Sequence, residues 1–181
     1  MERLYRSAYA SPLGMITLAS DGKALTGLWI DGQKYHGDGT FEKMERKDDL
    51  PLFAAVKKWL DRYFAGERPK ISELPLAPEG SEFRRMVWNI LCRIPYGETV
   101  TYGDIAKEVA LKMNKEKMSS QAVGGAVGRN PISIIIPCHR VVGADGNLTG
   151  YAGGIVRKIK LLEHEGADMS KFYVPLNGTA I

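Results

Sequence analysis

The sequence predicts two structurally different parts, a small N-terminal α/β part and a mostly α-helical C-terminal part. Short apolar or alternating runs, typical of strands, fill residues 4–30, whereas apolar residues at helical spacing dominate after residue 81. Between them, residues 67–80 contain three prolines and a glycine, as expected of a boundary. We therefore predict an N-terminal domain over residues 1–78, a C-terminal domain over 79–170 and a tail over 171–181.

Three runs in the N-terminal part are predicted to be strands, residues 4–10, 15–20 and 24–30. The Asp-Gly pair at 21–22 is typical of a hairpin between the last two. A polar loop is expected over 37–49. A helix follows, for which Asp49 is the expected cap, Pro51 suits the first turn and Gly66 provides an end. Its predicted buried face consists of Leu52, Val56, Trp59, Leu60 and Tyr63.

Three helices are predicted in the C-terminal part. The first follows the apolar positions Phe83, Val87, Ile90, Leu91 and Ile94. Thr101 and Asp104 have the spacing of a capping box and open the second helix. Ser119 or Ser120 can cap the third, which ends near Arg129. Two short consecutive helices are compatible with a helix-turn-helix, although helix pairs are common in any α domain.

The third of these helices is rich in glycine, with three glycines within residues 122–128. Each costs up to about 1 kcal/mol relative to alanine inside a helix, so something should compensate. One explanation is tight packing against another helix. The other is close approach to a nucleic-acid backbone, where larger side chains would collide.

Charge and composition limit the classes of protein that this chain can be. Hydrophobic residues make up 44% and charged residues 25% of its 181 residues, which excludes a disordered chain, a collagen-like repeat and a coiled coil. The net charge is +4, but residues 105–160 carry nine basic and three acidic side chains. Such a basic segment indicates either an anionic partner or a solvated lysine face.

The cellular setting is expected to be reducing and cytoplasmic. No apolar run approaches the roughly 18 residues of a membrane-spanning helix, and no apolar stretch follows the charges at the N-terminus, so neither a membrane association nor a signal peptide is expected. The two cysteines, Cys92 and Cys138, cannot form a disulfide framework.

The most informative stretch is an apolar run over 132–136, expected to be a buried strand, which leads into Pro137, Cys138 and His139. A cysteine in apolar surroundings usually belongs to the core. Here a histidine follows directly and basic residues flank the pair, which favours the nucleophilic thiolate. Neighbouring residues of a strand point to opposite faces, so either the chain bends at 137–139 or a water bridges sulfur and imidazole.

Residues 137–142, Pro-Cys-His-Arg-Val-Val, resemble the active-site signature of the O6-alkylguanine-DNA alkyltransferases, the methylated-DNA–protein-cysteine methyltransferases. Further segments follow in the family's order, at 96–102, 122–126, 128–131, 151–154 and 161–166. The resemblance covers roughly residues 80–166, and the N-terminal part matches only in general character. It implies a ribonuclease H-like N-terminal domain and a winged-helix C-terminal domain.

The resemblance also implies a reaction. Cys138 would attack the alkyl carbon on O6 of a damaged guanine and form a thioether, so each molecule would act only once. His139 would take the thiol proton through a water, and Glu165 would orient His139 and stabilise its charged form. Asn130 would brace the turn around the cysteine, and Tyr102 would donate a hydrogen bond to guanine N3.

The implied partner is double-stranded DNA, from which the alkylated guanine is flipped into a pocket, with O4-alkylthymine as an open second lesion. The pocket would be formed by Tyr102, Val127, Tyr151 and Ala152, with the carbonyls of Cys138 and Val141 reading the guanine amine. The glycine-rich helix would enter the minor groove. Its implied DNA-binding residues are Gln121, Ala122, Gly124, Gly125 and Arg129.

Three features depart from the family's pattern. Gln121 stands where an arginine commonly fills the gap left by the flipped nucleotide, and Ala152 stands where some members have serine. Residues 111–120 form a longer, lysine-rich connection. Some relatives have a zinc site, but no cysteine precedes position 92 and His36 stands alone, so we expect neither a metal nor a cofactor.

Two other classes of function remain as alternatives. A Cys-His hydrolase or transpeptidase would use Cys138, His139 and Glu165 on an acyl substrate and turn over many times. A non-enzymatic DNA-binding module would regulate or sense damage without chemistry. We favour single-turnover alkyl transfer by a monomer that needs no obligate protein partner.

Overall fold

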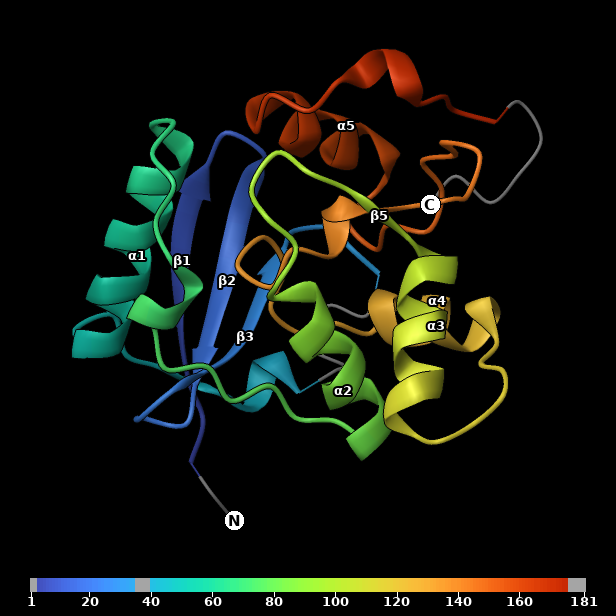
Figure 1. The fold of residues 1–181 in the computed structure, drawn as a ribbon. Helices are drawn as coiled ribbons and strands as arrows, with labels where there is room; N and C mark the ends of the chain where they lie inside the picture. The colour runs from blue at the N-terminus through green and yellow to red at the C-terminus, as the bar shows by residue number, and fades with distance from the viewer. Residues whose placement is uncertain (1–2, 35–39, 176–181) are drawn as a thin grey trace. The chain divides into compact units, whose positions relative to one another are not determined.

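The computed structural model describes residues 3–34 and 40–175 and divides the chain into two compact units (Figure 1). The first unit comprises Met1–Glu79 together with Pro131–Ile135, and the second comprises Gly80–Asn130 with Ile136–Ile181. The chain thus leaves the second unit for five residues and then returns. A boundary drawn along the sequence near residue 78 does not anticipate this excursion, because it depends on backbone pairing with a distant strand.

The first unit is built on a four-stranded sheet of strand order β3-β2-β1-β4. The strands are β1 (Tyr5–Ser11), β2 (Gly14–Ser20), β3 (Leu25–Ile30) and β4 (Glu45–Arg46). β1, β2 and β3 pair antiparallel, which confirms the three predicted strands and the hairpin at 21–22. β4 pairs parallel to β1 inside the stretch predicted as a polar loop. That prediction was wrong because a strand of two residues shows no periodicity; residues 35–39 of the loop lie outside the described part.

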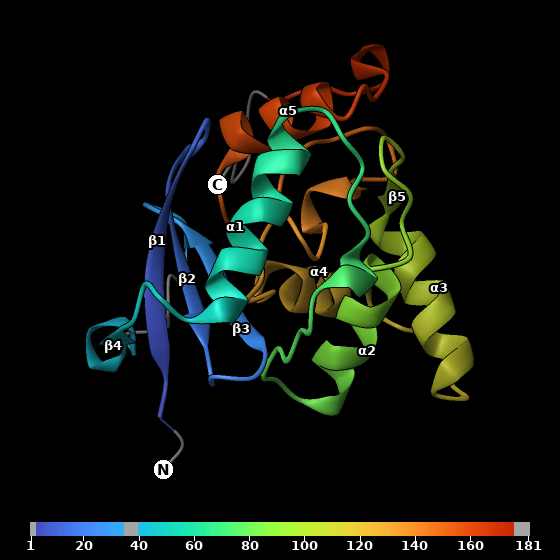
Figure 2. The ribbon, with the colours of Figure 1, turned by 90° about the vertical axis from the view of Figure 1, so that its left-hand side faces the viewer.

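The central strand β2 is buried on both faces. Its Ala19 belongs to a cluster with Trp29 and Met44, against which Leu4 packs. Helix α1 (Pro51–Phe64) runs beside the sheet, and both views show it alongside β1 and β2 (Figure 1, Figure 2). The cap of α1 is Leu50 and not the predicted Asp49, because the residue before a proline favours extended backbone and the helix starts one residue later.

The outer edge of β3 is covered by two separate segments. Leu25 exchanges backbone hydrogen bonds of 2.8 Å with Pro75 and Ala77. Leu28 donates to the carbonyl of Pro131 at 2.8 Å and accepts from Ser133 at 3.0 Å. Both segments occupy backbone groups that an exposed edge would leave unpaired.

The apolar run 132–136 is buried as predicted, but the prediction of a strand was wrong. Ile132 alone forms an isolated bridge, to Leu28, and the chain then turns. Ile134 has φ +70°, in the left-handed region that β-branched residues rarely adopt. Buried apolar residues in a turn and in a short strand look alike in sequence, so the pattern could not separate them.

Three helices of the second unit pack against one another, α2 (Glu82–Leu91), α3 (Tyr102–Lys112) and α4 (Ser120–Gly128). Trp88 on α2 donates its indole N–H to the carbonyl of Ala126 on α4 at 2.8 Å. The predicted caps are confirmed: Thr101 and Asp104 form a capping box, and Ser119 accepts from the backbone of Ala122. Local side-chain chemistry therefore sets where α3 and α4 begin.

The remainder of the second unit contains a parallel pair of short strands and a last helix. These are β5 (Val100–Thr101), β6 (Val141–Val142) and α5 (Ile155–His164). A cluster of Val142, Leu148 and Leu162 holds α5 to the segment after β6. Within residues 3–34 and 40–175, no helix is both long enough and apolar enough to cross a membrane.

Candidate active site

The predicted reactive pair lies in a buried one-turn 3-10 helix, Cys138–Arg140 (η4), which leads directly into β6. The chain bends at Pro137, so Cys138 and His139 do not alternate across a strand. Of the two alternatives drawn from the sequence, the structure therefore has the bend. Cys138 is 5% exposed and His139 is fully buried.

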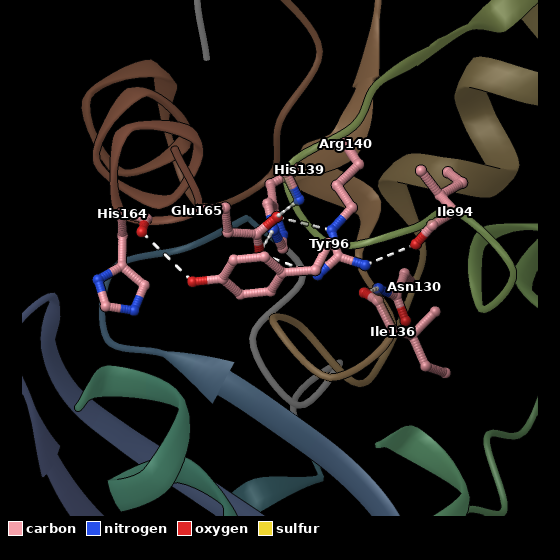
Figure 3. A network of polar contacts seen from close by, with 9 residues as sticks. Ile94, Tyr96, Asn130, Ile136, His139, Arg140, His164 and Glu165 are labelled. Atoms are coloured by element: carbon pink, nitrogen blue, oxygen red, sulfur yellow. Dashed lines mark hydrogen bonds and ion pairs between the residues drawn. The ribbon is translucent and has the colours of Figure 1, made fainter. Parts of the chain in front are cut away.

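The turn before the cysteine is held by a side-chain amide. Asn130 donates from Nδ2 to the carbonyl of Ile136 at 2.8 Å (Figure 3). The same carbonyl accepts from the backbone N–H of Cys138 at 2.8 Å. The Asn130 side chain also hydrogen-bonds the cysteine side chain. These contacts place Asn130 where a brace for this turn is needed.

Glu165, the residue that caps the C-terminus of α5, joins this turn through a buried carboxylate. Its Oε2 lies 2.7 Å from Nε2 of His139 (Figure 3). Arg140 donates from Nε to Oε1 at 2.7 Å and from Nη2 to Oε2 at 3.0 Å. Burial opposes ionisation, but the hydrogen bonds and charges of His139 and Arg140 outweigh it and hold the pKa of Glu165 well below its usual range.

His139 is expected to be neutral at physiological pH. Burial lowers its pKa most; contact with Glu165 raises it, and the positive charges of Arg140 and Lys158 lower it further. Because an ionised carboxylate only accepts hydrogen bonds, Nε2 must carry the proton that points to Glu165. Nδ1 then holds the lone pair, and it is buried with no hydrogen-bond partner in the described part of the chain.

Cys138 is expected to rest as a thiol. Burial raises its pKa, and this outweighs the hydrogen bond from Asn130 and the charge of Lys158, which lower it. Burial therefore opposes the thiolate that the flanking basic residues are predicted to favour. Arg140, the cation that follows His139 in the sequence, is itself bound to Glu165.

Lys158 is a fully buried cation that the sequence analysis did not select. Its Nζ donates to the carbonyl of Val141 at 2.5 Å and to that of Thr149 at 3.4 Å. Burial lowers its pKa to about 8, while the nearby Cys138 opposes this shift. Lys158 precedes the buried Leu161 and Leu162 by three and four residues, so helical spacing places it on the apolar face of α5. This spacing is the signal that could have identified it from the sequence.

The two predicted pocket tyrosines, Tyr102 and Tyr151, both interact electrostatically with Cys138. Tyr102, the first residue of α3, donates its hydroxyl to the carbonyl of Thr149 at 3.2 Å. Burial, reinforced by Cys138, raises the pKa of Tyr102 to about 12. Tyr151 is 2% exposed, its hydroxyl has no hydrogen-bond partner within the described residues, and Cys138 also acts on it electrostatically.

The other pocket residues are placed but not joined by specific contacts. Val141 begins β6 and is fully buried, with its carbonyl bound by Lys158. Val127 is buried on α4, and Ala152 is half-buried in the loop before α5. Their place in a pocket for a base stays a prediction.

Helix α4 has a small-residue outer face. Gln121, Ala122 and Gly125 are exposed, and Gly124 and Arg129 are half-buried. Its inner face consists of Val123, Ala126 and Val127. A Cβ added at Gly125 or Gly128 would meet nothing within 4 Å, and one at Gly124 would make only ordinary contact with Tyr102. Packing inside the protein therefore does not require glycine at 125 or 128.

No group of three or more His, Cys, Asp or Glu side chains with metal-binding geometry occurs in residues 3–34 and 40–175. His36, which the sequence analysis named, lies outside these residues.

Two family models match most of the chain. The ribonuclease-like domain of 6-O-methylguanine DNA methyltransferase matches residues 4–78. The DNA binding domain of 6-O-methylguanine DNA methyltransferase matches residues 82–167. The second match includes all of the residues described above around Cys138, His139 and Glu165.

Named relatives are similar over nearly the whole chain. A methylated-DNA–protein-cysteine methyltransferase of Haemophilus influenzae is 44% identical over 165 residues, which cover 91% of this chain and 88% of that protein. One of Methanosarcina acetivorans is 44% identical over 172 residues, covering 91% and 99%. The crystal structure of Mycobacterium tuberculosis OGT in complex with DNA has a TM-score of 0.76 and 40% identity, covering 93% of this chain and 94% of that one.

The buried carboxylate generates a prediction about stability. Glu165→Gln leaves the Arg140 charge without its partner and should lower the free energy of unfolding by about 3–5 kcal/mol at pH 7. Since the folded-state pKa lies below the ordinary 4.5, this stabilisation is present above pH 4.5 and lost as the pH falls. In urea unfolding, the difference in the free energy of unfolding between Glu165→Gln and the wild type should therefore become smaller at acid pH. Glu163→Gln, an exposed neighbour, is the control; an equal loss there would contradict the prediction.

Proposed function

The chain belongs to the 6-O-methylguanine DNA methyltransferase family, and we propose from this premise that Cys138 is the residue that accepts the alkyl group. The protein repairs DNA by transferring an alkyl group to a cysteine, and DNA is its partner. One observation carries the assignment of the residue. The chain has two cysteines, and Cys138 is the one that adjoins a buried histidine–carboxylate pair, whereas Cys92 follows α2 as its cap.

The transfer begins with a proton, because the resting sulfur is a thiol. His139 accepts the thiol proton at Nδ1, through a water, while Nε2 stays bound to Glu165, which stabilises the imidazolium. The thiolate then attacks the alkyl carbon, so that a carbon–sulfur bond forms as the carbon–O6 bond breaks. The electron pair of the broken bond stays on guanine, which takes up one proton in place of the alkyl group.

Two groups support the charges of this step. Lys158 places a positive charge near the sulfur and stabilises the thiolate as it forms. Tyr102 donates a hydrogen bond to guanine N3 as negative charge develops on the base. To do so, its hydroxyl breaks its hydrogen bond to the carbonyl of Thr149. A fixed donor that meets charge only in the transition state lowers the barrier. The product is a thioether with no hydrolytic route back, so each molecule reacts once.

We assign DNA contact to the outer face of α4. The pair α3–α4 acts as a helix-turn-helix, within a winged-helix domain that β5 and β6 complete. Gln121, Ala122, Gly124 and Gly125 enter the minor groove, where small residues allow close approach, and Arg129 supplies charge at the end of the helix. The flipped base is enclosed by Tyr102, Val127, Tyr151 and Ala152, with the carbonyls of Cys138 and Val141 at its amine.

The site of transfer is tested with DNA that contains O6-methylguanine. Cys138→Ser should abolish methyl transfer and keep DNA affinity, because the residue is buried and is not part of the contact face proposed on α4. Mass spectrometry of the wild type should find one methyl group, on the peptide that contains Cys138. Cys92→Ser is the matched control and should transfer normally. Transfer that persists in Cys138→Ser, or continuous turnover, would overturn the proposal and favour another cysteine or a hydrolase.

The glycines of α4 are tested by adding side-chain volume. Gly125→Ala should leave stability unchanged or raise it by up to about 1 kcal/mol, because alanine favours the helix and its Cβ meets open space. DNA affinity should nevertheless fall, and fall further in Gly125→Leu. Fluorescence anisotropy with duplex DNA measures this, and Ala55→Leu on the exposed side of α1 is the control. Undiminished affinity in Gly125→Leu would place DNA elsewhere.

Position 121 is tested by restoring charge. Gln121→Arg should tighten binding to damaged duplex DNA, because arginine adds a phosphate or base contact where glutamine has no charge. The gain should shrink as salt concentration rises, and titrations at two ionic strengths measure it. Unchanged or weaker affinity would count against a role for Gln121 in holding the flipped state.

A further inference from the structure

Arg140 carries a role that the proposed function does not give it. We propose that Arg140 is a positioning residue of the transfer reaction, which orients the Glu165 carboxylate onto Nε2 of His139 and offsets the charge of that carboxylate beside the imidazole. This inference rests on the proposed function, because it gives a reason for the availability of Nδ1 as the proton acceptor.

The guanidinium of Arg140 is fixed on three sides. Nε and Nη2 donate to the two oxygens of Glu165 at 2.7 and 3.0 Å, and Nη1 donates to the carbonyl of Ile94 at 2.7 Å (Figure 3). The centre of the Tyr96 ring lies 5.7 Å from the guanidinium carbon. A two-pronged contact of this kind sets the rotation of a carboxylate, which a single hydrogen bond does not.

The turn after Ile94 holds Glu165 from a further direction. The backbone N–H of Gly97 donates to Oε1 at 3.3 Å, and the hydroxyl of Tyr96 donates to the carbonyl of His164 at 3.3 Å. Gly97 has φ +79°, and a Cβ there would lie 2.8 Å from the backbone oxygen of Glu165. Oε1 thus accepts from Arg140 and Gly97, and Oε2 accepts from Arg140 and faces His139.

The charges around the imidazole explain why a cation is needed. Glu165 and Lys158 face His139 from α5 and its cap, Arg140 follows it in η4, and the Cys138 thiol precedes it. Cys138, Arg157 and Glu165 act electrostatically on the buried Tyr151 hydroxyl. Burial lowers the pKa of His139 most, whereas the Glu165 carboxylate favours the charged imidazole, which has no lone pair to accept another proton; the cation beside the carboxylate opposes that effect.

Arg140 offsets that tendency in a direction that can be measured. Its charge lowers the pKa of His139, whereas Glu165 raises it. Removing the Arg140 charge therefore raises the pKa of His139. Below that pKa the imidazole is protonated and cannot take the thiol proton, so the acid limb of the rate profile moves to higher pH.

The experiment measures single-turnover methyl transfer from O6-methylguanine DNA between about pH 5 and pH 9, together with the ¹⁵N shifts of His139. Arg140→Gln should slow transfer at pH 7 by at least about tenfold and move the acid limb and the His139 titration upward together. Arg140→Lys keeps the charge without the two-pronged contact. Its acid limb should stay near that of the wild type while its plateau rate falls, with DNA affinity unchanged.

A double variant separates this role from general damage to the fold. If Arg140 acts through Glu165, then R140Q/E165Q should transfer no more than about twofold slower than Glu165→Gln alone. The double variant also removes both buried charges, so it should fold even where Arg140→Gln does not.

Three results would overturn the proposal. They are an unchanged pH profile in Arg140→Gln, a double variant that multiplies the two single losses, and wild-type rates in Arg140→Lys. Wild-type transfer by Glu165→Gln would instead refute the proposed roles of His139 and Glu165, so the two failures are distinguishable. Should Arg140→Gln not fold, the double variant and Arg140→Lys decide the question.

Discussion

The buried carboxylate of Glu165 is the constraint on which the rest of the second unit depends. An ionised carboxyl removed from water is very unfavourable unless charged and hydrogen-bonding partners surround it. Those partners come from separate places in the chain, with Arg140 and His139 in η4 and the N–H of Gly97 in the turn before β5. The carboxylate meets these partners only once the end of α5 has docked. Folding of the second unit therefore also assembles the His139–Glu165 pair.

The same burial keeps the reactive pair uncharged until it is needed. It raises the pKa of Cys138 and lowers that of His139, so thiol and imidazole both rest in neutral form. In the proposed reaction, charge separates only when the proton moves, and Lys158 and Glu165 lie where they would stabilise the two resulting ions. A thiol that stays neutral until its proton is removed reacts slowly with unrelated electrophiles. This protects a protein whose cysteine can react only once.

Local chemistry made much of this molecule predictable, and distant pairing made the rest unpredictable. Strands β1, β2 and β3 and the caps of α3 and α4 follow from neighbouring residues, whereas β4, β5 and β6 exist only through their partners. The motif around Cys138 selected the proposed nucleophile and its proposed base, and the family resemblance supplied Glu165, 26 residues away from His139. Arg140 and Lys158 escaped because their roles depend on a carboxylate and on carbonyls that sequence spacing does not place.

The hydrogen bond from Trp88 to Ala126 has a consequence for how variants of this protein should be understood. Helix α4 contains too much glycine to be a stable helix by itself. Its packing against α2, which includes this hydrogen bond, therefore orders its outer face. Given the DNA contact proposed for α4, a change at the buried Trp88 would appear in a genetic screen as a defect in nucleic-acid recognition, although the indole is buried. The phenotype of such a variant would suggest a change on the outer face of α4, although the change lies on the inner side. A comparison of thermal stability with the wild type would show that the cause is lost packing.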